Sequence, residues 1–341
     1  MKDLKSLSPE ELREEMKALG QPGFRGDQLF DWLHVKKVRS LEEMSNLPKA
    51  LREKLKETYA LTDLRIEDCL VSALDGTRKY VFALGDGNLI ESVLMRYSYG
   101  NTVCISSQVG CRMGCRFCAS TLDGLARNML PGEMLDQIYR IEQDIGERVS
   151  HVVVMGTGEP LDNLDNLLAF IALLTHEKGN KLSERNVTVS TCGLAPRIRE
   201  LAEKKLQITL ALSLHAPNDA LRRTMMPVAE AYTIEETLAA CDAYFEATGR
   251  RMSYEYSLVK GVNDGEREAL ELASLLKGRN AHVNLIPVNP IRERDYETPD
   301  RARAEAFQKI LEKNGINATI RRKMGADIDS ACGQLRRRGK V

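Results

Sequence analysis

The most informative feature of the sequence is a group of three cysteines, Cys111, Cys115 and Cys118, in the pattern C-x3-C-x2-C. They follow a segment predicted to be a β-strand, and Gly110 and Gly114 keep the loop between them compact. Three thiolates on one short loop can hold three irons of an iron–sulfur cube, which usually takes four cysteine ligands. With only three, one iron stays open for an exchangeable ligand.

A structural zinc site is the first alternative for these thiols. Structural zinc is almost always closed by four ligands, and the fourth is not obvious, because no histidine lies nearby and Cys104 lies on the preceding predicted strand. Four of the eight cysteines fall within residues 104–118, so a chance cluster of buried thiols is the second alternative. A disulfide framework is not expected in a chain without export signals.

Composition places the chain among ordinary globular proteins. Its 341 residues are 43% hydrophobic and 29% charged, with 49 basic and 49 acidic side chains, so no net charge attracts it to nucleic acid or to a membrane. Any basic surface must be local. The first residues are densely charged, and no apolar run approaches the ~20 residues that span a bilayer. We therefore expect a cytoplasmic protein without a membrane segment.

Beyond residue 100, predicted strands alternate with predicted helices. The strands are Thr102–Ser106, Val149–Met155, Asn186–Thr191, Gln207–His215, Met252–Val259, Ala281–Val288 and Ile316–Arg321. The helices are Pro131–Gly146, Leu164–His176, Ala195–Glu203, Ile234–Ala247, Glu266–Leu276 and Arg301–Asn314. This alternation predicts βαβ units with a parallel sheet. Such units suit an incomplete or full α/β barrel, whose ligand site lies at the carboxyl ends of the strands.

The first hundred residues have a different organisation. Ser8 and Pro9 are typical of a helix start, and Gly26–Val35 and Leu47–Thr58 predict two further short helices. Residues 79–94 predict a β-hairpin. We therefore divide the chain into a helical N-terminal domain (1–65), a β-hairpin linker region (66–99) and an α/β barrel with a C-terminal segment (100–341).

The cysteine pattern at the end of the first barrel strand resembles the signature of the radical S-adenosylmethionine (SAM) superfamily. Further motifs, spread over essentially the whole chain, resemble the RlmN/Cfr family of RNA adenosine methyltransferases. They are Phe24–Leu29, Ser106–Cys111, Met155–Leu161, Ser213–His215 and Asp327–Leu335. The resemblance implies a radical SAM (β/α)6-type barrel with a small helical domain and a β-hairpin extension. Thr157 is a departure, since many relatives carry Met there.

The same resemblance implies the cofactor site. Cys111, Cys115 and Cys118 would hold one 4Fe–4S cluster, and SAM would bind the open iron through its amino and carboxylate groups. The implied SAM-binding residues lie at the ends of predicted strands: Gly158, Glu159, Ser190, Ser213, Leu214, His215 and Asn289. Taken singly, residues such as His215 or Asn289 more often have structural roles; their joint occurrence at strand ends favours a site.

Three catalytic residues are implied as well. Cys332 would be methylated by one SAM and, after hydrogen abstraction that uses a second SAM, would link its methylene carbon to the adenine. Cys104 would attack the Cys332 sulfur, so that a transient disulfide releases the RNA, and Glu91 would accept the ring proton. The basic runs Arg321–Lys323 and Arg336–Arg338 supply electropositive surroundings for a nucleophilic thiolate. The cysteines expected in ordinary core positions are Cys69, Cys192 and Cys241.

The partners implied by the resemblance are RNAs. The targets would be C2 of an adenosine in the peptidyl-transferase centre of 23S rRNA and of the adenosine 3′ of certain tRNA anticodons. A small reductant protein such as flavodoxin or ferredoxin would supply electrons, and we expect a monomer. We expect an RNA-binding face built from the C-terminal tail and the cations of the helical domain. These cations are Arg25, Lys36, Lys37, Arg39, Lys49, Arg52 and Lys54.

Two other functions stay open at this point. The Cfr branch methylates C8 of the same rRNA adenosine and shares every motif above, although the full N-terminal region and Met155–Pro160 favour the RlmN branch. The alternative from another class is a non-catalytic iron–sulfur or zinc RNA-binding protein, which would need neither Cys332 nor the SAM motifs.

Overall fold

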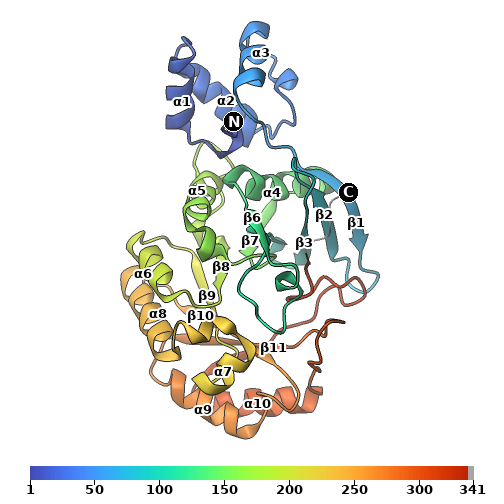
Figure 1. Ribbon diagram of the computed structural model, residues 1–341, viewed down its shortest axis with the longest axis vertical. Helices are drawn as coiled ribbons and strands as arrows, with labels where there is room; N and C mark the ends of the chain where they lie inside the picture. The colour runs from blue at the N-terminus through green and yellow to red at the C-terminus, as the bar shows by residue number, and fades with distance from the viewer. Residues whose placement is uncertain (337–341) are drawn as a thin grey trace.

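The computed structural model describes residues 1–336 and contains one large sheet. Its ten strands follow the order β1-β2-β3-β4-β7-β8-β9-β10-β11-β12. The first four are antiparallel to one another, and all neighbours from β4 onward are parallel. The predicted α/β barrel is therefore confirmed, in a form whose parallel strands run from β4 to β12 with helices on the outside (Figure 1).

The barrel elements match the prediction to within a few residues. The parallel strands are β4 (Gly100–Cys104), β7 (Val149–Val154), β8 (Val187–Thr191), β9 (Thr209–Ser213), β10 (Met252–Leu258), β11 (Ala281–Pro287) and β12 (Asn317–Ile320). The helices are α4 (Pro131–Ile145), α5 (Leu164–Thr175), α6 (Ala195–Glu203), α7 (Asp219–Met225), α8 (Ile234–Thr248), α9 (Glu266–Leu276) and α10 (Arg301–Lys313). Only the short α7 was not predicted. None of the described helices is long and apolar enough to cross a membrane.

The predicted β-hairpin is confirmed as β2 (Arg78–Ala83) and β3 (Leu89–Tyr97). Its last strand pairs with β4, with Val93 opposite Cys104, so the hairpin extends the sheet of the barrel. A third antiparallel strand, β1 (Arg65–Val71), was not predicted. It is a mostly exposed edge strand, and its sequence lacks the alternation of apolar and polar residues that marks a half-buried strand.

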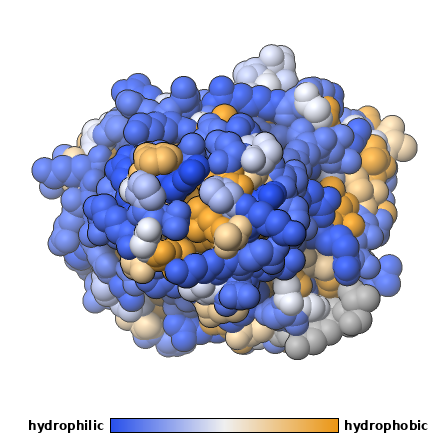
Figure 2. Space-filling view, turned by 90° about the horizontal axis from the view of Figure 1, so that it is seen from above, coloured by the Kyte–Doolittle hydropathy of each residue, from blue (hydrophilic) through white to orange (hydrophobic). Residues whose placement is uncertain are grey.

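Three helices form the N-terminal part, at one end of the molecule in Figure 1: α1 (Pro9–Ala18), α2 (Phe24–His34) and α3 (Lys49–Thr58). The predicted start of α1 is a capping box, in which Glu11 N donates to Ser8 Oγ at 3.2 Å and Ser8 N donates to Glu11 Oε2 at 2.8 Å. Figure 2 looks onto this end, whose surface is mainly hydrophilic with smaller apolar areas. The segment before α1 docks on the barrel through the fully buried pair Lys5–Asp136.

Alternation along the barrel strands decides which side chains reach the site. In β8, Val187 and Val189 are completely buried in the main hydrophobic core, whereas Ser190 lines the central cavity. In β9, Leu212 belongs to the core and Ser213 lines the cavity. Because successive side chains of a strand point to opposite faces, apolar residues face the helices and small polar ones face the inside of the barrel.

Candidate active site

A cavity of about 920 Å³, including the space open to solvent, lies at the predicted site. Side chains at the carboxyl ends of the parallel strands surround it, as expected for a barrel. It brings together most of the predicted site residues: Cys111, Cys115, Cys118, Gly158, Glu159, Ser190, Ser213, His215, Asn289 and Cys332. Leu214 is different, because its side chain is buried in the core and does not line this cavity.

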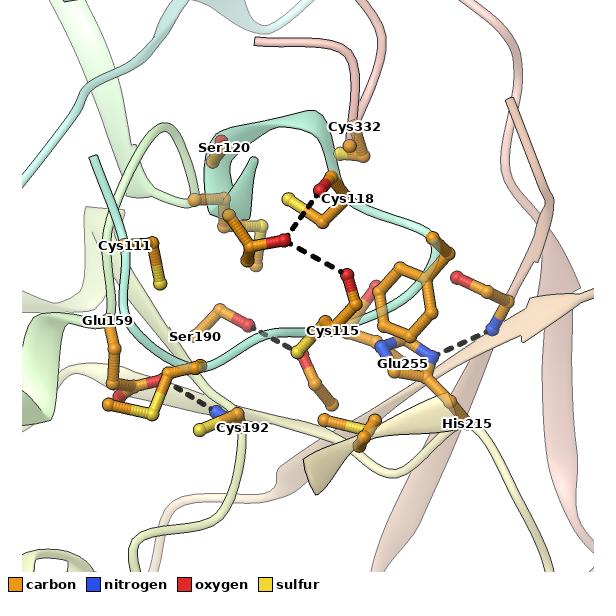
Figure 3. Close-up of a pocket in the computed structure, with 18 of the residues that line it drawn as sticks. Cys111, Cys115, Cys118, Ser120, Glu159, Ser190, Cys192, His215, Glu255 and Cys332 are labelled. Atoms are coloured by element: carbon orange, nitrogen blue, oxygen red, sulfur yellow. Dashed lines mark hydrogen bonds between the residues drawn. The ribbon is translucent and has the colours of Figure 1, made fainter. Parts of the chain in front are cut away.

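The cysteine loop lies between two short strands, β5 (Gln108–Gly110) and β6 (Leu125–Asn128), which pair with each other. Figure 3 shows the thiols of Cys111, Cys115 and Cys118 pointing into the same part of the cavity. Thr121 Oγ1 donates to the carbonyl oxygens of Cys118, at 2.9 Å, and Cys115, at 3.3 Å, which fixes the turn that carries both thiols. The loop is thereby shaped before any cofactor binds.

The donor set of this loop fits an iron–sulfur cluster. Burial raises the pKa of Cys111 to about 12 and raises the pKa values of Cys115 and Cys118 as well. Free thiols therefore stay protonated at neutral pH, and a bound metal would have to displace their protons. Within residues 1–336, no three His, Cys, Asp or Glu side chains converge closely enough for a single metal ion. A cube binds thiolates at separate corners, which three thiols around one open cavity can supply.

Glu159 is a buried acid that lines the cavity. Its carboxylate accepts hydrogen bonds from Cys192 N at 2.7 Å and from Leu161 N at 3.0 Å, while burial raises its pKa. The preceding Gly158 has φ +111°, and a Cβ there would lie 2.6 Å from Cβ of Gln108. Only glycine fits at this position, so the Gly-x-Gly pattern serves the close approach of two backbone segments and the orientation of Glu159.

His215 is held as a neutral imidazole. Its Nδ1 accepts a hydrogen bond from Ser257 N at 2.9 Å, and burial together with the charge of Arg222 lowers its pKa to about 3. The remaining proton is therefore on Nε2. The ring stacks edge-on against Phe117 of the cysteine loop, with centroids 4.6 Å apart. His215 can thus present an N–H donor, but not a charge, to a ligand in the cavity.

A second cavity of about 740 Å³ adjoins the first. Met155, Asn289, Arg321 and Cys332 line both, and Cys104 lines only the second. Burial raises the pKa of Cys104 to about 12. The structure therefore places Cys332 between the three clustered thiols on one side and Cys104 on the other, and all eight cysteines are free thiols.

Glu91 lies on β3 and lines neither cavity. It is almost completely buried, with Lys79 Nζ 3.7 Å from Oε1. Its Oε2 accepts a hydrogen bond from Arg336 N at 2.9 Å. The predicted proton acceptor is thus covered by the same C-terminal segment that carries Cys332. The predicted basic residues Arg337 and Arg338 lie outside the described residues.

Two known protein families match separate parts of the chain. Residues 105–273 match the radical SAM superfamily, and residues 2–61 match the ribosomal RNA large subunit methyltransferase N-terminal domain. The chain is 61% identical, over 98% of its length and 96% of the relative, to a protein of Lachnospira eligens named "Probable dual-specificity RNA methyltransferase RlmN". A protein of the same name from Lachnoclostridium phytofermentans is 58% identical over 98% of this chain and 94% of the relative. The chain belongs to the RlmN family.

A solved structure agrees with this assignment. The crystal structure of a radical SAM methyltransferase from Sphaerobacter thermophilus superposes with a TM-score of 0.94 and 42% identity, over 98% of this chain and 99% of that one. The radical SAM fold expected from the sequence is therefore confirmed. Membership of the RlmN family implies a 4Fe–4S cluster and SAM as cofactors.

Several cavity residues of this RlmN-family chain were missed by sequence reasoning. Cys192 was expected in an ordinary core position, but it lines the main cavity and packs beside Cys115. Glu255 also lines that cavity; burial raises its pKa, and Asn284 Nδ2 and Ser253 Oγ donate to its two oxygens. A charged residue inside the apolar run 252–259 was the available signal for Glu255. For Cys192 the available signal was its position two residues after Ser190, an implied SAM-binding residue.

The expected basic face of the helical domain is weakened by internal pairing. Lys37 pairs with Glu142 on α4, Arg39 pairs with Asp63 at 3.0 Å, and Lys36 pairs with Asp31 at 3.2 Å. Other cations of the set donate to carbonyl oxygens of the same domain: Arg25 to Asn46, Arg52 to Glu42 and Lys54 to Leu19. Most of these charges therefore have partners in the chain, and the RNA-binding face stays a prediction.

Proposed function

We propose that the chain is a radical SAM methyltransferase that methylates C2 of an adenosine in 23S rRNA and in tRNA. The proposal rests on family membership and on one feature of the site. Cys332 lies in the wall shared by two cavities, with the three clustered thiols in one and Cys104 in the other. A thiol that first accepts a methyl group near SAM and is later attacked by a second thiol needs this placement.

The roles of the chain's own residues follow from it. Cys111, Cys115 and Cys118 hold the cluster, and Glu159, Ser190, Ser213, His215 and Asn289 bind SAM, with the Leu214 backbone between Ser213 and His215. When bound, the cluster supplies one electron for the reductive cleavage of SAM and the hydrogen abstraction that follows. Asn289 Nδ2 donates to the Cys332 carbonyl at 3.1 Å and fixes the methyl carrier against the SAM side.

The later steps use three side chains. Cys332 carries the one-carbon unit and becomes linked to the adenine through it. Glu91 takes the ring proton, for which the covering C-terminal segment must admit the base. The Cys104 thiolate then attacks the Cys332 sulfur. The S–S bond forms as the S–C bond to the methylene breaks, and the released carbon takes up a proton to become the methyl group of the base. We also propose that a flavodoxin- or ferredoxin-like protein supplies the electrons, that two SAM molecules are used per methyl group, and that the chain works as a cytoplasmic monomer.

The position of the methyl group on the product adenosine tests this proposal. The full chain, loaded anaerobically with iron and sulfide and supplied with SAM, a reductant and either 23S rRNA or tRNA, should yield 2-methyladenosine in digests analysed by mass spectrometry. A product methylated at C8 would assign the chain to the Cfr-type reaction instead. Absence of both products, with SAM left intact by a loaded cluster, would favour a non-catalytic RNA-binding protein.

A further inference from the structure

The side chain of Arg222 on α7 is the largest that is fully buried in the described structure. Nε donates to Leu214 O at 3.2 Å, and Nη2 donates to Cys192 O at 2.6 Å and to Ser213 O at 3.3 Å. Nη1 has no hydrogen-bond partner within the described residues. The guanidinium therefore links the carboxyl ends of β8 and β9 through carbonyl oxygens alone.

The charge of Arg222 is not neutralised by a contacting acid. No ion pair within residues 1–336 includes it, and Asp219 on the same helix acts only at longer range. Burial lowers its pKa, but arginine stays protonated in proteins. A buried cation without a counter-charge is strongly unfavourable. The three carbonyl oxygens offset part of that cost, and an anion bound close by would offset more of it.

The elements that contact Arg222 also contact the cysteine loop. Arg116 N donates to Met225 O at 2.9 Å, which joins the loop to the end of α7. The Cys192 carbonyl accepts the hydrogen bond from Arg222 Nη2, and the Cys192 side chain packs with Met225 against Cys115. A Cβ at Gly193 would lie 3.0 Å from Nη2 and 2.8 Å from Cγ2 of Thr237, so the glycine lets the guanidinium approach this strand end.

We propose that Arg222 is the buried counter-charge of the iron–sulfur cluster and eases its one-electron reduction. The inference rests on the cluster proposed above. Three thiolates outweigh the positive charge of an oxidised 4Fe–4S core, so the bound cluster is anionic and becomes more so on reduction. Net charge and surroundings set the reduction potentials of such clusters. A fixed cation behind Cys115 and Cys192, excluded from water, stabilises the reduced form more than the oxidised form.

A purely structural role predicts a different result. Arg222 also braces three carbonyl groups, and a brace depends on shape and hydrogen bonding rather than on charge. Arg222→Lys keeps the charge and loses the fork of donors, whereas Arg222→Gln keeps a donor and loses the charge. Arg223→Gln is the matched control, since this neighbour lies on the same helix, is partly exposed and lies 3.7 Å from Glu230 at the surface.

The experiment is a redox titration of the full chain loaded anaerobically with the cluster, without SAM, followed by the paramagnetic resonance signal of the reduced cluster. For Arg222→Gln we expect the ratio of reduced to oxidised cluster at a given solution potential to fall at least about tenfold, which is ~59 mV for one electron. Arg222→Lys should change the ratio less than about threefold, and Arg223→Gln should not change it.

Every other outcome also decides the question. Cluster loss in Arg222→Gln with retention in Arg222→Lys supports the counter-charge. An unchanged reduction potential in Arg222→Gln overturns the proposal. An equal shift of the potential in both Arg222 variants, or loss of iron from folded protein in both, also overturns it and would assign Arg222 a purely structural role. A wild-type chain that binds no iron and sulfide would overturn the cluster assignment itself, which separates that failure from failure of the Arg222 role.

Discussion

At the scale of single residues, the two thiols that line the second cavity have different surroundings, which suit the different roles proposed for them. Cys332 is partly exposed and lies in the wall of both cavities, whereas Cys104 is buried on β4. Cys332 and Glu255 both raise the pKa of the half-buried Arg321 guanidinium, because each lies close enough to interact with it electrostatically. Arg321 is therefore an electropositive neighbour of the thiol that is proposed to accept a methyl group.

Chain isolated with its cluster intact should carry a methyl group on Cys332. We expect part of the C-terminal peptide to be heavier by ~14 Da, the mass of one CH₂ added to a nucleophilic thiol. Mass spectrometry of digested protein measures this. Cys332→Ala should still bind SAM and RNA but transfer no methyl group to RNA. Methylated RNA from this variant would mean direct transfer to the base and would remove Cys332 from the mechanism.

Removal of the Cys104 thiol should stop the reaction at the covalent intermediate. Cys104→Ala should form a nuclease-sensitive RNA–protein band on a denaturing gel, and Cys332→Ala and the double variant should not, because the link cannot form. Normal turnover by Cys104→Ala without such a band would contradict the proposed release step.

The buried position of Cys104 also predicts how release depends on pH. Burial raises its pKa to about 12, and only the thiolate attacks a sulfur. Between pH 7 and 9 the thiolate fraction therefore rises about tenfold per pH unit. In single-turnover experiments with wild-type protein, the RNA–protein band should decay faster by the same factor. A decay rate independent of pH would exclude Cys104 as the attacking group in a rate-limiting release.

Sequence reasoning located those side chains that belong to contiguous motifs. The cysteine loop, the Gly158–Glu159 pair and the Ser213–His215 segment stand out because each combines unusual residue types within a few positions. Arg222, Cys192 and Arg321 gain their surroundings from segments far apart in the chain. One arginine in a short helix has no local mark that distinguishes it from its exposed neighbour Arg223.

At the scale of elements, the hairpin positions Glu91, the proposed proton acceptor. Glu91 on β3 is opposite Val81 on β2, and Lys79 on β2 is opposite Val93. Lys79 Nζ also donates to Asp329 O at 3.1 Å in the C-terminal segment. One buried ammonium thus joins the hairpin, the carboxylate and the segment that carries Cys332.

Replacement of Lys79 should remove the contacts that this side chain makes with Glu91 and with the C-terminal segment. In Lys79→Met we expect a loss of about 3–5 kcal/mol in the free energy of unfolding, because the change removes one partner of a buried ion pair. Urea denaturation followed by circular dichroism measures it. The linked RNA–protein species should also persist longer than in wild type, since the misplaced carboxylate removes the ring proton more slowly.

Two variants test whether charge is the cause. Lys79→Arg keeps a cation and should recover most of the stability and the rate at which the linked species is resolved. Lys309→Met, at an exposed lysine of α10, should leave both unchanged. Equal effects of Lys79→Arg and Lys79→Met would show that packing, rather than charge, holds Glu91.

Most barrel elements could be predicted because their strands are buried on both faces and their helices are amphipathic. The exceptions have physical reasons. The strand β1 lies at the sheet edge with most side chains exposed, so it carries no periodic apolar pattern. The helix α7 is only seven residues long and contains the sequence Arg222–Arg223, which is typical of a surface loop until Arg222 is seen to point inward.

At the scale of the whole molecule, the helical domain is attached by buried polar contacts. Lys5 Nζ lies 2.7 Å from Asp136 Oδ1 on α4, and both side chains are completely buried. Asp136 Oδ2 accepts a hydrogen bond from Leu64 N at 2.7 Å, and Arg140 lies 3.4 Å from the same carboxylate. The two ends of the helical domain, before α1 and after α3, therefore meet on one acid of the barrel.

This arrangement predicts that Lys5 controls how firmly the helical domain is held. Lys5→Met leaves Asp136 buried with Arg140 as its only contacting cation in the described part of the chain. We therefore expect the free energy of unfolding to fall by an amount near the lower end of about 3–5 kcal/mol. Protease cleavage between residues 58 and 64 should become faster, while iron content stays that of wild type because the cysteine loop is untouched. Replacing both partners, as Lys5→Met with Asp136→Leu, should recover part of the stability, since no charge is then left buried at that contact. Lys17→Met, which removes a surface pair with Glu14, should change neither quantity. Loss of the cluster in Lys5→Met, or equal protease sensitivity of Lys17→Met, would show that the helical domain is held by other contacts.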